Sequence, residues 1–333
     1  MAGYTVECGD LRGWASQVSR ASDDMGAAHK YALGQIPDAD FGKILELITG
    51  PYAGLLEPFH SVLEADGTRL GKTSEALKTA EKIYQGMESE AGDRFAKLDA
   101  GAQGTVEDDG EASAFKDGES GAAELTPPNG DVTLPEVSLG FPFDQICDLC
   151  AQFTGFDPRE KITQWIAGDV GKAMRQSSAW TSTANCTDAV NGNLKAGQAA
   201  ISNTWTGEAS NAAAKHVSAW LKSLTEQGTG MRQMGEHLKT AVDEAVKMAQ
   251  VVVDIVKTVF SLLSSAWANA AIPAYGQWKL IKTVKDGVSM LWNAVKVINV
   301  FKSFIVMIVD FVKAVVASFN VSALPPAPAG GPA

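Results

Sequence analysis

The chain has 333 residues, which is longer than one typical domain, so its length predicts about two domains. A formal net charge of −11 argues against a nucleic-acid-binding surface. Alanine and small polar residues are plentiful, sevenfold repeats of apolar residues are long, and alternating strand patterns are almost absent. The predicted class is therefore all-α.

The N-terminal region predicts a hairpin of two helices. The first helix is expected over residues 10–33, with Asp10 as its N-cap and Gly34 at its C-cap. The second helix is expected to begin at Pro51 and to run to about Leu98. A sevenfold repeat along it predicts lengthwise packing against neighbouring helices. The members of this repeat are Leu56, Leu63, Leu70, Leu77 and Tyr84.

A stretch rich in acids, glycine and proline follows at residues 101–140. It holds nine acidic residues and a single basic one, Lys116. Such a stretch cannot bury enough apolar surface to order itself. It is predicted to be a solvated linker, with an acidic binding tail as the disfavoured alternative.

Two long helices are expected on either side of Trp205-Thr206-Gly207. The helix before this tripeptide is expected to start at Asp157, and the helix after it to reach about Ala271. Sevenfold repeats in both helices predict lengthwise packing. Gly207 can adopt backbone angles that strain other residues, and Trp205 can cover the end of the helix pair. The tripeptide is therefore predicted to be the turn of an antiparallel hairpin.

Cys147 and Cys150 fall in a short apolar helix expected around residues 141–153. No second cysteine pair or nearby histidine completes a zinc site, and no strand precedes the pair as in a thioredoxin-like motif. Burial as small apolar side chains is the favoured interpretation, and a reversible disulfide is the alternative.

A last helix with a very wide apolar face is expected over residues 277–319. The helix after Gly207 would span ~95 Å and the one before it ~70 Å, so the last helix is predicted to fold back at residues 273–276 and cover the excess. Seven lysines against three aspartates in residues 251–320 also suit an anionic lipid surface, so membrane contact there stays an alternative.

These elements predict two long antiparallel helical hairpins that form a four-helix bundle with a C-terminal helical extension. The predicted domains are an N-terminal hairpin (1–100), the acidic linker (101–140), the long hairpin (141–273), a C-terminal amphipathic helix (274–322) and a disordered tail (323–333).

The sequence contains no recognisable catalytic constellation. The four histidines are isolated along the chain, and no zinc-protease, phosphate-loop or serine-nucleophile motif is present. A non-enzymatic protein without a metal site or cofactor is predicted.

The Trp-x-Gly turn at Trp205 and Gly207, set between two long helices, resembles the WXG family of type VII (ESX) secretion substrates from actinobacteria. Upstream, Gly168-Asp169-Val170 is similar to the Gly-Asp-Trp of larger members, with valine in place of tryptophan, and is expected inside the first long helix. The resemblance covers about residues 1–265 and does not include the last helix.

The N-terminal hairpin, with Asp40-Phe41-Gly42 at its turn, looks like the small ESX secretion-associated hairpins. Those carry a Tyr-x-x-x-Asp/Glu export motif after their second helix, and Tyr84 and Glu88 match it here.

This resemblance implies export in a folded, helical state by a type VII machine whose membrane-bound ATPase engages the substrate. The N-terminus has neither a basic start nor an apolar run, so a secreted or cell-surface location without a cleaved signal peptide is expected. A separate small helical hairpin or a second copy of the chain are the partners left open. The alternatives are a membrane-active or pore-forming protein acting through residues 251–320 and a cytosolic helical scaffold.

In two-chain members of the family, one chain carries the Trp-x-Gly and its partner the Tyr-x-x-x-Asp/Glu, and the two lie together as a composite export signal. Here each hairpin carries one of them, as if both partners were fused. Tyr84 and Trp205 are therefore predicted at the same end of one bundle, with the linker running ~70 Å along it. The alternative is that Trp205 only plugs a helix end and Tyr84 only completes its heptad.

Overall fold

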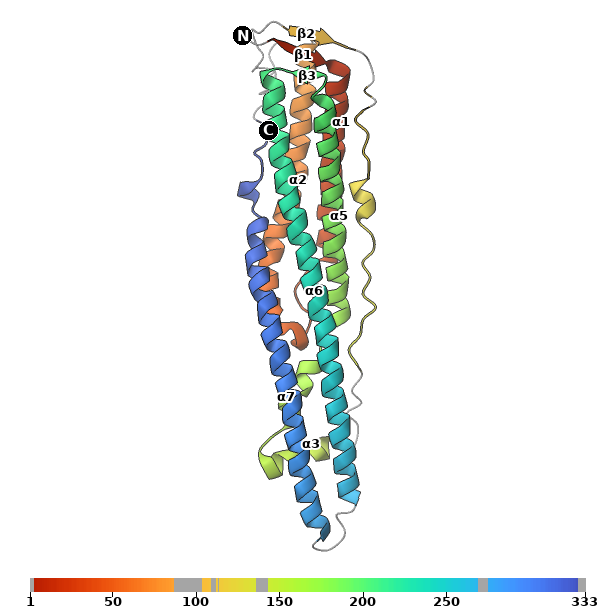
Figure 1. The fold of residues 1–333 in the computed structure, drawn as a ribbon, viewed down its shortest axis with the longest axis vertical. Coiled ribbons are helices and arrows are strands. Elements are labelled where there is room, and N and C mark those ends of the chain that lie inside the picture. Colours follow the sequence, from red (N-terminus) through yellow and green to blue (C-terminus); the bar gives the residue numbers. More distant parts are fainter. Residues whose placement is uncertain are drawn as a thin grey trace.

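The computed structural model describes residues 3–86, 104–108, 112, 114–135, 143–268 and 275–328. These residues form seven α-helices and one small three-stranded sheet, so the protein is predominantly all-α, as predicted. The elements are β1 (Tyr4–Glu7), α1 (Cys8–Gln35), α2 (Glu46–Tyr84), β2 (Gly104–Glu107), α3 (Phe143–Thr154), α4 (Pro158–Lys161), α5 (Val170–Ile201), β3 (Trp205–Thr206), α6 (Glu208–Ala268) and α7 (Tyr275–Val315). The molecule is long and narrow, with the sheet at one tip, called the sheet end below (Figure 1).

The first helix starts earlier and ends later than the sequence predicted. β1 leads directly into α1, so Glu7 is the N-cap residue and Asp10 lies inside the first turn. At the other end, α1 continues past Gly34, and Ile36 is the C-cap residue. The predicted caps at Asp10 and Gly34 are therefore both wrong. The strand, which the sequence did not reveal, sets the start of the helix.

α2 begins before Pro51 and contains both Pro51 and Pro58. An internal proline costs a helix about 3 kcal/mol, which is why Pro51 was predicted to start the helix. Ile48 and Tyr52, on either side of it, are fully buried. Burial of side chains of this size stabilises the fold by about 1.5–3 kcal/mol each, which offsets the proline penalty.

The second helix of the first hairpin ends at Tyr84 and not near Leu98. Gly86 has a φ of 73°, and its backbone nitrogen donates to the carbonyl oxygen of Ile83, which closes the helix. Residues 87–103 lie outside the described part of the chain. Tyr84 is thus the last residue of α2 and not a residue within a longer seam.

The second long helix pair also begins differently from its prediction. Asp157 does act as an N-cap, because its carboxylate accepts a hydrogen bond from the backbone nitrogen of Arg159 at 2.9 Å, but only of the four-residue α4. A second cap at Asp169 starts α5. Gly168 and Asp169 therefore precede the long helix, and the prediction that they lie within it is wrong.

The turn of the first hairpin holds the start of α5. The backbone nitrogen of Asp169 donates to the carbonyl oxygen of Phe41 at 3.0 Å. A Cβ atom on Gly42 would lie 2.6 Å from the Cα atom of Gly168, so the two backbones approach as only glycine allows. α5 therefore starts at the far end of the first hairpin and runs back to the sheet end (Figure 1).

Five long helices pack lengthwise. α1 packs on α2 and α5, α5 packs on α6, and α7 packs on α6 and α2. α7 covers the part of α6 that extends beyond the other helices, as predicted from the difference in length (Figure 1). Because α7 also lies against α2, a four-helix bundle does not describe the whole arrangement. Among the described residues, no helix has both the length and the apolar character needed to cross a bilayer.

The linker is not a free tether over residues 114–135. It lies in the groove between α1 and α5 and runs along the bundle, as the predicted topology requires (Figure 1). Phe115 is only 5% exposed, and the hydroxyl of Tyr31 donates to the carbonyl oxygen of Thr126 at 2.6 Å. The prediction of a solvated linker is therefore wrong for these residues.

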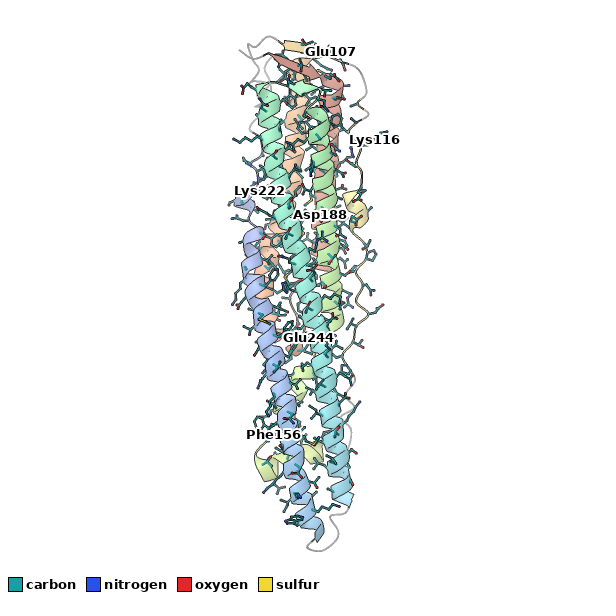
Figure 2. The ribbon with its side chains drawn as sticks, viewed as in Figure 1. Glu107, Lys116, Phe156, Asp188, Lys222 and Glu244 are labelled. Carbon is teal, nitrogen blue, oxygen red and sulfur yellow. The ribbon has the colours of Figure 1, made fainter. Side chains whose placement is uncertain are left out.

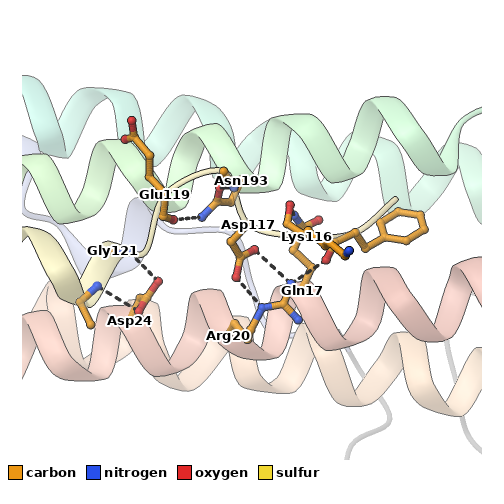
Figure 3. A network of polar contacts seen from close by, with 11 residues as sticks. Gln17, Arg20, Asp24, Lys116, Asp117, Glu119, Gly121 and Asn193 are labelled. Atoms are coloured by element: carbon orange, nitrogen blue, oxygen red, sulfur yellow. Dashed lines mark hydrogen bonds and ion pairs between the residues drawn. The ribbon is translucent and has the colours of Figure 1, made fainter. Parts of the chain in front are cut away.

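Polar side chains of the helices hold this segment in place (Figure 3). Arg20 of α1 forms an ion pair with Asp117. The carboxylate of Asp24 accepts a hydrogen bond from the backbone nitrogen of Gly121 at 3.0 Å. Asn193 of α5 donates to a linker carbonyl oxygen at 2.7 Å. The linker is thus ordered by groups that α1 and α5 supply, which its own composition could not show.

The C-terminal tail is also partly held. Arg69 of α2 donates to the carbonyl oxygens of Leu324 and Pro325 at 3.2 and 3.3 Å, and Leu324 is buried. The prediction of a disordered tail is therefore wrong for residues 323–328, while residues 329–333 lie outside the described part. Of the turn predicted at residues 273–276, Pro273 and Ala274 also lie outside it, whereas Tyr275 and Gly276 are the first residues of α7, so the prediction is wrong for these two.

Candidate functional site at the sheet end

The three short strands bring distant parts of the chain together at the sheet end. β1 is the central strand, parallel to β2 and antiparallel to β3. Thr5 pairs with Thr206, and their hydroxyl groups lie 2.7 Å apart. Glu107, the last residue of β2, marks this tip of the molecule in Figure 2. The sheet therefore ties the start of the first hairpin to the turn of the second.

The Trp-x-Gly turn has the geometry that the sequence predicted. Gly207 has a φ of 114°, which strains any residue with a Cβ atom. Trp205 is 1% exposed, and its carbonyl oxygen accepts a hydrogen bond from the hydroxyl of Ser210 at 2.7 Å. The turn thus reverses the chain within a few residues and directs the indole into the bundle.

Trp205 and Tyr84 are in contact, so the prediction that they share one end of the bundle is confirmed. The indole nitrogen of Trp205 donates to the hydroxyl of Tyr84 at 3.3 Å. Their ring centroids are 6.3 Å apart at an interplanar angle of 81°, an edge-to-face arrangement that aromatic pairs favour. Trp205 is buried, whereas Tyr84 is only partly buried, so the pair joins the core to the surface.

Two further aromatic residues complete this cluster. The ring of Trp14 lies 6.2 Å from that of Trp205, and the ring of Tyr4 lies 5.4 Å from that of Tyr84. We call these four residues the aromatic tip cluster. The sequence placed Trp14 on a helix but did not connect it with Trp205, and β1, which carries Tyr4, was missed. A strand of four residues is too short to produce a periodic signal.

A group of charged side chains joins the elements that carry the cluster. A nitrogen of the Arg12 guanidinium lies 2.7 Å from a carboxylate oxygen of Glu81 and 3.7 Å from one of Asp108. The hydrogen bond to Glu81 is the main cause that raises the pKa of Arg12. Asp108 also accepts a hydrogen bond from Gln85 at 3.1 Å. Asp108, the residue after β2, therefore contacts both α1 and the residue that follows α2.

The structure describes three of the four predicted site residues. Tyr84, Trp205 and Gly207 are brought together, and Glu88 lies outside the described residues. The chain leaves Tyr84 through Gly86, so the acidic half of the motif follows the cluster directly in sequence.

The cysteines and histidines provide no evident reactive centre within the described residues. Cys147 and Cys150 are buried, which confirms the favoured interpretation, and burial raises the pKa of Cys150 to about 11. His29 and His60 are closer than the sequence suggested, with ring centroids 6.4 Å apart. No group of three metal-ligating side chains is found in the described ranges.

Comparisons with protein-family models, with curated proteins and with solved structures find no match to this chain. The interpretation of the sheet end therefore depends on its own residues and on the motif resemblance.

Proposed function

We propose that this protein is a substrate or structural component of a type VII (ESX) secretion system, exported in its folded state and without enzymatic activity. Tyr84, Glu88, Trp205 and Gly207 form its composite export signal. The observation that supports this most is the contact between Trp205 and Tyr84, which unites two half-motifs from separate hairpins of one chain.

The two halves have different roles in this proposal. Trp205 is buried, so a recognition protein cannot contact its side chain directly. It acts as a positioning residue that fixes Tyr84 and the start of the segment leading to Glu88. Tyr84, which is only partly buried, and Glu88, four residues further along the chain, are then the residues that the secretion ATPase recognises.

A signal of this kind exists only in the folded chain. Trp205 and Tyr84 are far apart in sequence and meet only when both hairpins have packed. This dependence suits export of a folded protein. It also removes the need for a separate small hairpin partner, because the N-terminal hairpin fills that position.

Export from an actinobacterial host with an active type VII system tests the proposal. The wild-type protein should reach the culture supernatant and should fail to do so when the secretion ATPase is deleted. Tyr84→Ala and Glu88→Ala should each keep the protein inside the cell. Tyr31→Ala is the matched control, because Tyr31 is also partly buried and also hydrogen-bonded but belongs to the linker contacts.

Trp205 needs a gentler substitution than alanine. Removing a buried tryptophan side chain costs about 3–5 kcal/mol, so Trp205→Ala would destabilise the fold as well as remove the contact with Tyr84. Trp205→Phe keeps an aromatic ring but removes the donor to Tyr84, and Tyr84→Phe removes the acceptor. Both should reduce export while the melting temperature changes little.

Three results would count against the proposal. If the Tyr84 and Glu88 variants were exported normally, these residues would not form an export signal, and Trp205 would only cover the end of its helix pair. If the protein still reached the supernatant after deletion of the ATPase, export by the type VII machine would be excluded. Absence of the wild-type protein from the supernatant would favour a cytosolic scaffold.

A further inference from the structure

α7 leaves part of its apolar surface uncovered. Its inner side is buried against α6 and α2, as Val284, Leu291 and Ile298 show. On the opposite side, Trp278 is 62% exposed, Val300 71% and Met307 63%. Exposed apolar residues are common singly, but several on one helix face indicate a contact surface.

These residues lie on one stripe with lysines. At 3.6 residues per turn, Trp278, Trp292, Val300 and Met307 fall within an arc of ~80°, and the stripe extends ~44 Å along the helix. Lys282, Lys285 and Lys296 occupy the same arc and are exposed. We call these seven residues the outer face of α7.

The lysines of the outer face differ from three exposed lysines of the neighbouring helix. On α6, the exposed residues Lys222, Lys239 and Lys247 each pair with an acidic residue one turn away on the same helix. Lys282, Lys285 and Lys296 form no ion pair with any other described residue. The outer face is thus positively charged, although the whole chain has a net charge of −11, and Asp310, which continues the same arc beyond Met307, pairs with Lys313.

The two tryptophans of the outer face, Trp278 and Trp292, keep about half or more of their surface exposed. The ammonium group of Lys282 lies 5.6 Å from the ring centroid of Trp278. Trp292 rests against Phe156, with ring centroids 5.1 Å apart, and is still 49% exposed. Phe156 lies in the half of the molecule away from the sheet end (Figure 2). Tryptophan favours the headgroup level of a bilayer, where lysine can extend its ammonium group to phosphate.

A groove beside the outer face adds apolar depth. It lies between α6 and α7, has a volume of about 330 Å³, and is lined by Val251, Val300, Phe301 and Phe304 among others. Val251 of α6 is itself 44% exposed. The apolar lining therefore continues from α7 onto Val251 of α6, and the charged residues Glu244 and Lys247 of α6 line the same groove.

We propose that the outer face of α7 adsorbs to an anionic phospholipid bilayer with the helix parallel to the membrane plane. Charge complementarity decides the occupant. Pairing of two copies through this face would bring together lysines that have no ion-pair partner, whereas anionic headgroups would neutralise them. The helix need not leave α6, because its inner side stays packed.

Sedimentation of the full chain with phospholipid vesicles tests this. The protein should bind vesicles that contain phosphatidylglycerol, bind pure phosphatidylcholine vesicles far more weakly, and dissociate as salt is raised. The triple variant Lys282→Glu, Lys285→Glu, Lys296→Glu should bind ~100-fold more weakly, because each lysine near an anionic surface contributes about 1 kcal/mol.

The triple variant Lys72→Glu, Lys78→Glu, Lys222→Glu is the matched control. It changes the net charge by the same amount at exposed lysines of α2 and α6 away from the outer face, and it should bind as the wild type does. Lys222 is labelled on α6 in Figure 2. A further variant, Trp278→Ser with Met307→Ser, should weaken binding about tenfold, because it removes apolar area from the interface.

Several outcomes would overturn the proposal. These are equal binding to both kinds of vesicle, no binding to either, and equal weakening by the two lysine variants. A concentration-dependent dimer that Trp278→Ser abolishes would make a second copy the occupant. Release of a dye trapped in the vesicles would indicate perforation and not adsorption. Circular dichroism of each variant checks that the helices remain.

Discussion

A single buried carboxyl group should make the stability of this bundle depend on pH. Asp66, in the middle of α2, is fully buried, and one of its oxygens accepts a hydrogen bond from the side-chain nitrogen of Gln227 on α6 at 3.3 Å. Its other oxygen, and the side-chain oxygen of Gln227, have no hydrogen-bond partner among the described groups. A protonated Asp66 can donate to that oxygen, which would satisfy both.

Burial raises the pKa of Asp66 to about 8, against the smaller opposing effects of Gln227 and the positive charge of Arg69. In the unfolded chain this pKa is 3.8, so folding takes up a proton between these two values. The stability contributed by protonated Asp66 is fully present below about pH 4 and is lost as the pH rises through 8. Each pH unit in this range corresponds to about 1.36 kcal/mol, so the loss between roughly pH 5 and pH 8 is ~4 kcal/mol.

The substitution Asp66→Asn should remove this dependence. Asparagine is neutral at every pH in the range, has nearly the same shape, and can donate to Gln227. The free energy of unfolding, measured by urea denaturation with circular dichroism, should show that the advantage of the variant over the wild type grows by ~4 kcal/mol between about pH 5 and pH 8. Glu64→Gln, at an exposed position of α2, is the control and should show no such growth.

If the difference between the Asp66 variant and the wild type changed by less than about 1 kcal/mol over this range, the carboxyl group would not be held neutral by burial. Such a result would refute the large rise in the pKa of Asp66.

Two further predictions concern the linker and the turn. Asp24→Ala removes the acceptor of the hydrogen bond from Gly121, so it should destabilise the fold by about 1–3 kcal/mol and speed proteolysis within residues 114–135, whereas Asp23→Ala, exposed on the same helix, should do neither. Gly207→Ala should destabilise the fold by about 1–2 kcal/mol because of the positive φ of Gly207. Gly192→Ala, at a position of α5 where a Cβ atom meets no other group, should stabilise the fold by about 0.5–1 kcal/mol. Equal effects of the two variants in thermal unfolding would show that the positive φ of Gly207 carries no cost.

The sequence by itself was sufficient for the helices and their seams. Sevenfold repeats predicted the long helices, and on α6 the residues at every seventh position from Val217 to Val259 are all buried. A second heptad position of α6, three residues further along, is buried at Trp220 but exposed at Leu262. Helix periodicity is a local property, so it can be read without knowledge of the partner.

The sequence also sufficed for the placement of the motif residues. Once Gly207 was recognised as a turn and the helix lengths were known, topology required Tyr84 and Trp205 to share an end, and their contact confirms it. This inference used only chain direction and the rise per residue.

Tertiary structure alone decided the strands, the helix limits and the order of the linker. β1 has four residues, and its partners β2 and β3 lie about 100 and 200 residues away, so no local pattern marks them. α2 keeps Pro51 inside it because neighbouring side chains are buried, and the acidic linker is held by Arg20 and Asp24 of α1. In each case the stabilising groups come from elsewhere in the chain, and only packing of the hairpins brings them within reach.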